Sequence, residues 1–251
     1  MYRSAYDLKS FYNSKVGRVV RRTLQRRIRS FWPDVSTMRV MGCGYASPYL
    51  RGFMGEAERV FAVMPAGQGA HHWPQTTDEK NLVCLSEEAE LPFENNSIDR
   101  IILVHSLEFA ELLQPNLQEI WRVLKANGRV LVIVPNRAGL WARADWSPFG
   151  QGAPYSVSQV CYYLRDNSFS HERTEEALFM PPAQEGILLK SAGLFERAGP
   201  YIMPFVAGVH MVEASKQVFA SIDKGSGSKV RVSGRAFLPR PEPQGFGSYK
   251  S

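Results

Sequence analysis

The segment that decides the fold reads, from residue 91 to 135, LPFENNSIDRIILVHSLEFAELLQPNLQEIWRVLKANGRVLVIVP. Its two apolar runs, 99–106 and 129–135, are continuous rather than alternating, as in parallel strands that are buried on both faces. Between them, apolar residues recur at helical spacing from Leu112 to Leu124, and Asn127-Gly128 is typical of a helix end. The order strand, helix, strand predicts two parallel strands joined by a crossover helix.

The same alternation extends outward from this segment. We predict further strands over 37–44, 59–64 and 81–85, and a helix that starts within 49–55. Beyond 135, the sequence predicts a helix over 156–167 and two apolar segments at 194–205 and 206–219. This alternation predicts an α/β fold with a mostly parallel central sheet and helices on both faces.

Composition excludes several classes of protein. The 251 residues are 44% hydrophobic and 22% charged, which is ordinary for a globular chain. No apolar run reaches the ~18–20 residues that a membrane span requires. Cys43, Cys84 and Cys161 lie far apart and form neither a CxxC pair nor a disulfide framework. We therefore expect no metal site and a reducing, cytoplasmic location.

Charge is distributed unevenly along the chain, whose net charge is +6. Residues 1–30 contain nine Lys and Arg against Asp7 alone, and 221–251 contain six against two acids. The rest of the chain is therefore mildly acidic. This pattern disfavours a polyanion-binding core but allows a weak anionic partner at the basic ends.

The N-terminal segment 1–34 is predicted to form one basic amphipathic helix that ends at Pro33. Its apolar residues recur at steps of four or five: Phe11, Val16, Val20, Leu24 and Ile28. Three interpretations stay open, namely a packed helix with a solvated basic face, a helix that contacts an anionic partner, and a transit sequence that is removed. At the other end, the Gly-, Ser- and Pro-rich residues 221–251 are predicted to be disordered.

A glycine turn, Gly42-Cys43-Gly44, follows the first predicted strand. Ligands of open parallel sheets bind beyond the carboxyl ends of the strands, and glycine lets the backbone turn tightly and approach a ligand. The dinucleotide pattern GxGxxG fails because Ser47 occupies the last position, and the chain has no GK[ST] sequence for a P-loop. NAD chemistry and ATP hydrolysis are therefore disfavoured.

Three segments in this order carry a family resemblance: MGCGYAS (41–47), ELPFENNSIDRIILVHSLEF (90–109) and EIWRVLKANGRVLVIVPN (119–136). Over about 36–136 the chain resembles class I S-adenosylmethionine-dependent methyltransferases of the type 11 group. The resemblance implies a Rossmann-like fold. It also implies that 208–217 is the last strand, within a C-terminal antiparallel hairpin over 194–217.

The resemblance further implies S-adenosyl-L-methionine as the cofactor. Its binding residues would be Gly42, Cys43, Gly44, Tyr45, Met64, Glu87, Glu88, Ala89 and His105. Glu87 or Glu88 would lie near the adenine amino group. His105 would end the fourth strand beside the methyl group, which makes it the candidate catalytic base. The other interpretation of His105 is a hydrogen-bonded histidine that closes a strand.

The stretch 136–192 interrupts the rhythm of strands and helices where a lid or substrate wall would lie. Aromatic and arginine side chains in it are suited to clasp a planar or anionic group, and we predict substrate contacts from Asn136, Arg137, Trp141, Trp146 and Tyr155. Alternatively, these aromatic residues close the open end of the fold. The predicted organisation is thus 1–34, a methyltransferase-like domain over 35–220 that includes this insertion, and a tail over 221–251.

The chain departs from the family pattern at three positions. Val40 and Met64 replace acids, of which the second would accept hydrogen bonds from the ribose, and Ala46 replaces a glycine. The leading hypothesis is a methyltransferase that acts on an unidentified acceptor. The alternative is a non-catalytic protein of the same fold that binds a partner or regulates it. A third hypothesis is a nucleic-acid binder that uses the basic ends.

Overall fold

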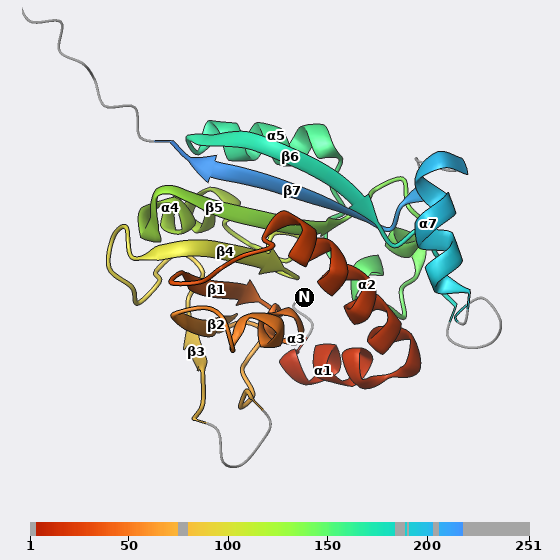
Figure 1. Cartoon of the computed structure of the whole chain (residues 1–251), viewed down its shortest axis with the longest axis horizontal. Helices are drawn as coiled ribbons and strands as arrows, with labels where there is room; N and C mark the ends of the chain where they lie inside the picture. The colour runs from red at the N-terminus through yellow and green to blue at the C-terminus, as the bar shows by residue number, and fades with distance from the viewer. Residues whose placement is uncertain (1–3, 75–79, 184–188, 190, 203–205, 218–251) are drawn as a thin grey trace, which may run out of the picture. The chain divides into compact units, whose positions relative to one another are not determined.

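A seven-stranded sheet forms the centre of the computed structural model, which describes residues 4–74, 80–183, 189, 191–202 and 206–217 (Figure 1). The strand order is β3-β2-β1-β4-β5-β7-β6. The first five strands of this order are parallel, and β7 is antiparallel to both β5 and β6. Their bounds are β1 (Arg39–Gly44), β2 (Arg59–Pro65), β3 (Val83–Ser86), β4 (Ile98–Val104), β5 (Leu124–Pro135), β6 (Phe169–Ala177) and β7 (Val209–Lys216). The predicted fold class is confirmed.

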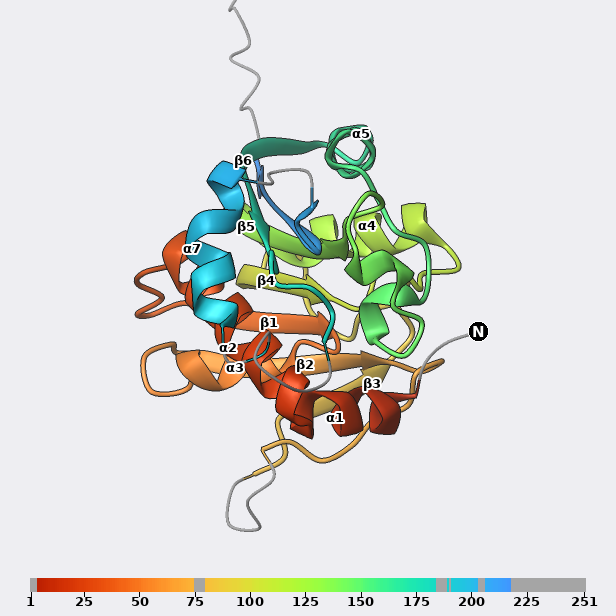
Figure 2. The same ribbon diagram turned by 90° about the vertical axis from the view of Figure 1, so that its right-hand side faces the viewer.

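Helices cover both faces of this sheet, as Figure 2 shows edge-on. One face packs against α1 (Ala5–Asn13), α2 (Lys15–Phe31) and the short α3 (Ser47–Leu50), and the other against α4 (Leu113–Val123) and α5 (Val157–Asp166). α7 (Ala192–Ile202) lies beside α2. Short 3-10 turns are formed by Arg51–Phe53, Trp141–Arg143 and Pro148–Gly150. The two apolar cores are separated by the sheet, as expected for strands buried on both faces.

The N-terminal segment forms two helices rather than the single helix that we predicted. Ser14 ends α1 and caps α2, since its hydroxyl oxygen accepts a hydrogen bond from the Gly17 amide. A side chain at Gly17 would collide with the backbone of Phe11 and Tyr12, so glycine permits the tight corner between the helices. The apolar spacing continues through this corner, which is why the sequence pattern did not reveal it.

The C-terminal antiparallel pair is present, but its first strand is not within 194–205. Residues 192–202 form α7, and β6 pairs with β7 instead. β6 reads FSHERTEEA and is the polar edge strand of the sheet, so it lacks the apolar run that marks buried strands. The predicted last strand, 208–217, agrees with β7, and the predicted helix 156–167 agrees with α5.

None of the helices in the described ranges has the length and apolar composition to cross a membrane. The predicted tail, 221–251, lies outside the described residues.

Candidate functional site

The carboxyl ends of β1, β2, β3 and β4 meet at one edge of the sheet, because parallel registry pairs Gly44 with Val104 and Pro65 with Ser86. Gly44 ends β1 with a φ of +74°. A Cβ atom added there would lie 2.3 Å from the Val104 carbonyl oxygen. At Gly42, an added Cβ atom would lie 2.6 Å from the Cβ of Ala46. Both glycines are therefore required by close packing of β1 against its own protein neighbours.

His105 lies at this edge, directly after β4, and is fully buried. Its Nε2 lies 2.9 Å from the hydroxyl of Tyr12, and its Nδ1 lies 3.0 Å from Glu108 Oε1. The Tyr49 hydroxyl donates to the Tyr12 hydroxyl at 3.0 Å. With Nδ1 protonated, the imidazole donates to the carboxylate and accepts from Tyr12, so every polar atom of the ring is hydrogen-bonded. In this conformation neither ring nitrogen is free to take a proton from a substrate.

A series of buried hydrogen bonds runs from Tyr49 in α3 through Tyr12 in α1 to His105 and Glu108 in the turn after β4. Burial raises the pKa of Tyr12 well above its ordinary value, and nearby Tyr49 adds to this effect. Burial also raises the pKa of Tyr49. Both phenols therefore stay neutral and act as donors and acceptors of hydrogen bonds. In addition, the Gln68 side chain donates to the His105 carbonyl oxygen at 2.8 Å and holds the positive φ of 51° at His105.

A cavity of about 10 Å³ lies beside this cluster. It is formed by the ends of four strands and by α4, and its lining residues are Cys43, Gly44, Val63, Pro65, Ser86, Glu88, Leu91, Ser106, Asn116 and Ile120. Two polar atoms that are buried at this place, Oε1 of Glu88 and Nδ2 of Asn116, have no hydrogen-bond partner. An acceptor and a donor without partners are unusual in a protein interior, where such groups are nearly always paired.

The electrostatics of the cavity centre on Glu88. Burial raises the pKa of its carboxyl group to about 7, and the nearby charges of Glu108, Glu87 and Glu111 act in the same direction. The carboxyl group therefore exchanges its proton near neutral pH. Burial also raises the pKa of the Cys43 thiol, so this cysteine is not an activated nucleophile.

The remaining predicted cofactor residues lie away from this cavity. Glu87 and Ala89 are exposed. Met64 is buried in the core on the α1 and α2 side of the sheet, because side chains alternate along β2. Tyr45 stacks on Tyr12 with ring centroids 5.5 Å apart, and its hydroxyl lies 3.2 Å from His71 Nε2. Of the predicted set, the structure thus brings Cys43, Gly44 and Glu88 together at the cavity.

The predicted substrate residues pack mainly against the protein itself. Asn136 donates to the Ala207 carbonyl oxygen at 2.8 Å, and the fully buried Trp141 donates to that of Met180 at 2.8 Å. Tyr155 donates to the carbonyl oxygen of Leu107 at 3.2 Å. Trp146 is half-buried, and its ring contacts Phe11 and Trp141.

Arg137 alone among these five residues is exposed. The loop that carries them reaches the His105 cluster through Phe149, whose ring centroid lies 4.9 Å from that of His105.

Sequence reasoning missed four residues that shape the site: Tyr12, Tyr49, Glu108 and Asn116. Glu108 follows His105 by three residues, a spacing that allows contact in a turn, and this was the one signal available. Tyr12 and His105 are 93 positions apart, so only the folded chain reveals their contact. Among the described residues, no three His, Cys, Asp or Glu side chains are arranged to hold a metal ion.

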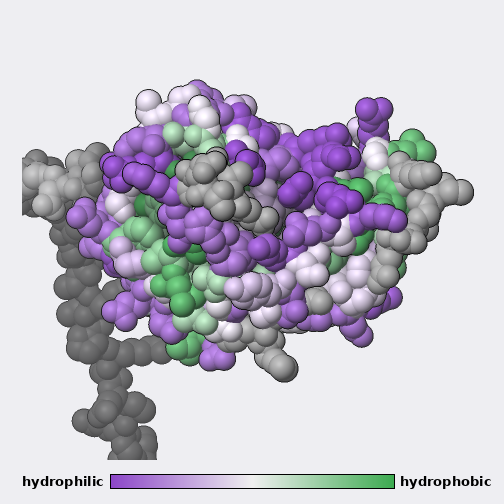
Figure 3. Space-filling view, turned by 90° about the horizontal axis from the view of Figure 1, so that it is seen from below, coloured by the Kyte–Doolittle hydropathy of each residue, from purple (hydrophilic) through white to green (hydrophobic). Residues whose placement is uncertain are grey.

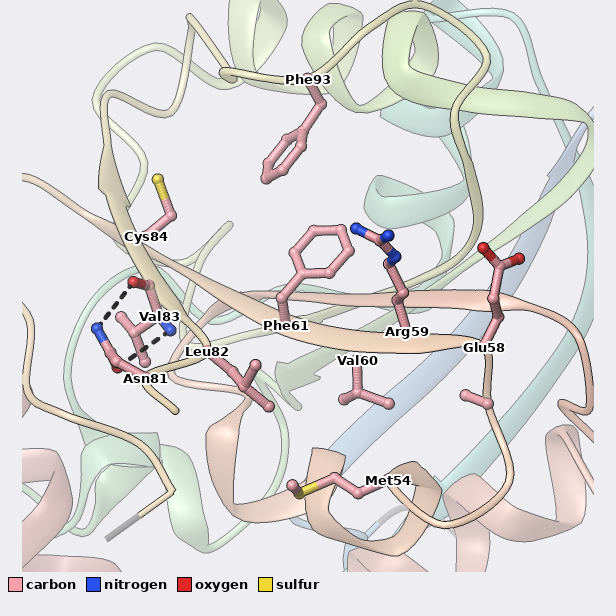
Figure 4. Close-up of a pocket in the computed structure, with 11 residues that line it drawn as sticks. Met54, Glu58, Arg59, Val60, Phe61, Asn81, Leu82, Val83, Cys84 and Phe93 are labelled. Atoms are coloured by element: carbon pink, nitrogen blue, oxygen red, sulfur yellow. Dashed lines mark hydrogen bonds between the residues drawn. The ribbon is translucent and has the colours of Figure 1, made fainter. Parts of the chain in front are cut away.

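A second hollow, of about 520 Å³, lies at the opposite end of β2 (Figure 4). Phe61 and Phe93 point toward each other on one side of β2, with ring centroids 4.9 Å apart, whereas Met54, Val60 and Leu82 lie on the other side. Pairing of β2 with β3 begins at Ala62, so the first residues of β2 have no strand beyond them among the described residues. The hollow is therefore an apolar stretch of open sheet edge.

Comparison with known proteins finds one family match and several solved structures with a similar fold. Residues 40–132 match the family described as "Methyltransferase domain". A search of curated protein sequences finds no match. Among solved structures, a SAM-dependent methyltransferase from Archaeoglobus fulgidus is similar with a TM-score of 0.58 and 15% identity, covering 78% of this chain and 94% of that one.

Two further structures have the same fold. A putative methyltransferase in complex with the Trm112 methyltransferase activator of Haloferax volcanii has a TM-score of 0.56 and 15% identity, and covers 85% of this chain and 99% of that one. A S-adenosylmethionine-dependent methyltransferase from Mesorhizobium loti has a TM-score of 0.56 and 15% identity, with 76% and 96% coverage. The resemblance seen in the sequence is confirmed: residues 40–132 match a methyltransferase domain, and the described fold is that of class I S-adenosylmethionine-dependent methyltransferases.

Proposed function

We propose that the protein transfers a methyl group from S-adenosylmethionine to an acceptor that is still to be identified. The observation that carries this proposal lies at the carboxyl ends of the strands, where Glu88 Oε1 and Asn116 Nδ2 are buried beside the cavity and form no hydrogen bond in this conformation. Both atoms belong to the segment 40–132 that matches a methyltransferase domain. Open parallel sheets bind their ligands at this edge. We likewise propose a cytoplasmic location, which the three free cysteines support.

The residues present fit the adenosine end of the cofactor. The Glu88 carboxylate is suited to accept from the adenine amino group, and the Asn116 amide to donate to a ring nitrogen. The backbone at Cys43 and Gly44 would lie along the nucleoside. At the end of β2, Pro65 lines the cavity and offers no carboxylate for the ribose hydroxyls.

The cavity must also widen before a nucleoside enters. Its volume is about 10 Å³, whereas small-molecule sites are usually ~300–1,000 Å³. We infer that Leu91 and Ile120, the apolar side chains of the lining, move apart on binding.

When bound, the cofactor supplies an electrophilic methyl group on sulfur. The protein then has to orient the acceptor and, where the acceptor carries a proton, remove it. His105 is the candidate base that would accept this proton. It serves only if Tyr12 releases Nε2, since that nitrogen is hydrogen-bonded to the Tyr12 hydroxyl at 2.9 Å. Arg137, exposed in the predicted substrate loop, is placed to meet an anionic part of the acceptor.

Calorimetric titration of the full chain with S-adenosylmethionine, and separately with S-adenosylhomocysteine, tests the proposal. We expect micromolar binding, and we expect Glu88→Ala to weaken it about 10–100-fold through loss of a charge-assisted hydrogen bond. Glu87→Ala is the matched control, because that neighbouring carboxylate is exposed and outside the cavity. A folded chain that binds neither compound at millimolar concentration contradicts the proposal.

A second candidate function, binding of a protein partner without catalysis, is favoured by the apolar hollow at the open edge of β2. Exposed apolar surface beside unpaired strand residues is a typical docking site for another chain. A putative methyltransferase with this fold from Haloferax volcanii forms a complex with the Trm112 methyltransferase activator, which supports this candidate. This candidate predicts no nucleoside binding by the chain alone, and a stable complex with a Trm112-type protein that Phe61→Glu abolishes. The absence of such a complex contradicts it.

A further inference from the structure

A basic cleft of about 510 Å³ separates α2 from α7. α2 contributes most of its charge, since it contains seven Lys and Arg and no acidic residue. Arg22, Arg26 and Arg27 line the cleft from α2, and Arg197 lines it from α7. Glu196 is the one acidic residue in the lining. The cleft therefore has a strong excess of positive charge.

Three of these arginines are free to bind an anion. Arg27 faces Glu175 at 3.6 Å, whereas Arg22, Arg26 and Arg197 are exposed and have no ion pair or hydrogen bond within the described part of the chain. Glu196 forms no ion pair with any of the three, and its Oε1 accepts a hydrogen bond from the Phe179 amide at 2.7 Å, so a single carboxylate stands against four arginines in the lining. Uncompensated arginines on one surface favour an anionic partner.

The outward face of α7 adds apolar side chains to this charge. Leu194, Tyr201 and Ile202 are 68%, 89% and 71% exposed. Leu194, Arg197 and Tyr201 follow one another at steps of three and four, which places them on one side of the helix. Figure 3 shows hydrophobic and strongly hydrophilic residues side by side at the end of the molecule that carries α7.

We propose that this surface, formed by Arg22, Arg26 and Arg197 with Leu194, Tyr201 and Ile202, binds an anionic phospholipid membrane from one side. A helix with exposed apolar residues beside cations is suited to the boundary between headgroups and acyl chains. The arginines bind lipid phosphates, and the apolar side chains enter the boundary region. A nucleic acid would use the arginines and Tyr201, but it has no acyl-chain region for Leu194 and Ile202 to enter, as a membrane has. A membrane of anionic lipids would be the anionic partner that the basic N-terminal segment predicts, and its binding does not depend on methyl transfer.

Flotation of the unaltered full chain with lipid vesicles tests the lipid requirement. Vesicles of phosphatidylcholine alone are compared with vesicles that contain equal parts of phosphatidylcholine and phosphatidylglycerol. We expect at least a tenfold preference for the anionic vesicles, which decreases as salt is raised because the Debye length shortens. Equal binding to both kinds of vesicle, or binding to neither, overturns the proposal.

Two charge variants of the full chain locate the surface. The test variant combines Arg22→Gln, Arg26→Gln and Arg197→Gln. At about fivefold per arginine, it should lose on the order of 100-fold in affinity for anionic vesicles. The control removes the same charge from other exposed positions, namely Arg59→Gln, Lys80→Gln and Arg165→Gln. An equal loss in both variants, or no loss in the test variant, overturns the proposal.

Variants in the apolar half of the surface distinguish membrane binding from nucleic-acid binding. The double variant Leu194→Ser and Ile202→Ser should lose about tenfold per side chain in vesicle binding and keep its salt dependence. Fluorescence anisotropy with a labelled 20-nucleotide RNA gives the competing result. Salt-dependent RNA binding that the arginine variant abolishes and the apolar variant leaves intact, without vesicle binding, overturns the membrane proposal in favour of a nucleic acid.

Discussion

At the residue scale, the carboxyl group of Glu88 links the candidate site to stability. Its pKa is about 7 in the folded chain, against an ordinary value of 4.5, because the group is buried near other carboxylates. The folded chain thus holds this proton more tightly than the unfolded chain. The stabilising contribution of the protonated Glu88 carboxyl group is fully present below about pH 4.5 and is lost as the pH rises through 7.

Glu88→Gln should therefore raise the free energy of unfolding at pH 8 by on the order of 1–3 kcal/mol and leave it nearly unchanged at pH 5. Urea unfolding at the two pH values measures the effect. Glu87→Gln, at the exposed neighbouring position, should change stability little at either pH. A Glu88→Gln variant with an unaltered pH dependence would show that this carboxyl group is not perturbed.

Gly44 gives a second prediction at this scale. Gly44→Ala should lower the free energy of unfolding by ~2–4 kcal/mol, because the added Cβ atom meets the Val104 carbonyl oxygen at a positive φ. Gly69→Ala is the matched control, since Gly69 has nearly the same φ, +76°, but no atom within 4 Å of the added Cβ. The Gly69→Ala variant therefore measures only the free-energy cost of a side chain at a positive φ, which is ~1 kcal/mol. Equal losses in the two variants would contradict a steric role for Gly44.

At the element scale, α1 is attached to the candidate site by polar contacts as well as by its apolar face. Tyr12 contacts His105 and Tyr49, and the Ala5 amide donates to the Gln68 carbonyl oxygen at 2.8 Å. Gln68 in turn holds the backbone at His105. Helix α1 and the turn that follows β4 are thus coupled through buried hydrogen bonds.

Tyr12→Phe should lower the free energy of unfolding by ~1–3 kcal/mol, because it leaves His105 Nε2 and the Tyr49 hydroxyl without their partner. Thermal or urea unfolding measures it. Tyr6→Phe on the same helix is the control, since Tyr6 is 66% exposed, and it should change stability by less than ~0.5 kcal/mol. A Tyr12→Phe variant as stable as the control would mean that solvent reaches this cluster.

At the scale of the whole molecule, α1 and α2 form a large part of one core. The described α3 has only four residues, so the N-terminal helices cover most of the sheet face beside it. Seven of their apolar side chains are buried there: Leu8, Phe11, Val16, Val20, Leu24, Ile28 and Phe31. At ~1.5–3 kcal/mol each, their burial contributes on the order of 10–20 kcal/mol. This equals or exceeds the ~5–15 kcal/mol by which whole domains are stable.

A chain that begins at residue 32 should therefore fail to fold cooperatively. Amide NMR spectra and a calorimetric melt of the shortened chain measure this, with the full chain as reference. We expect collapsed peak dispersion and no heat-absorption peak. A sharp unfolding transition in the shortened chain would instead favour the interpretation of the N-terminus as a transit sequence that is removed.

The fold could be predicted from the sequence because its buried parallel strands are continuous apolar runs. DRIILVHS and RVLVIVP have no other stable environment than a sheet covered on both faces. The amphipathic spacing of α2 and α4 could likewise be recognised from residues that are near one another in the sequence. β6 escaped prediction because an edge strand is free to be polar, and the corner at Ser14 escaped because the apolar spacing runs through it.

The candidate site was decided mainly by tertiary structure. Local sequence identified Gly44 and His105 as residues at strand ends, since strand ends follow from the strands themselves, and the family resemblance indicated Glu87 or Glu88. Their environment depends on groups that are distant in the chain, such as the Tyr12 hydroxyl for His105 and the charge of Glu108 for Glu88. Burial, hydrogen bonding and pKa are properties of these contacts. The sequence by itself thus determined the buried parallel strands of the sheet, because their apolar runs are local, whereas packing determined the polar edge strand and what the sheet edge can bind.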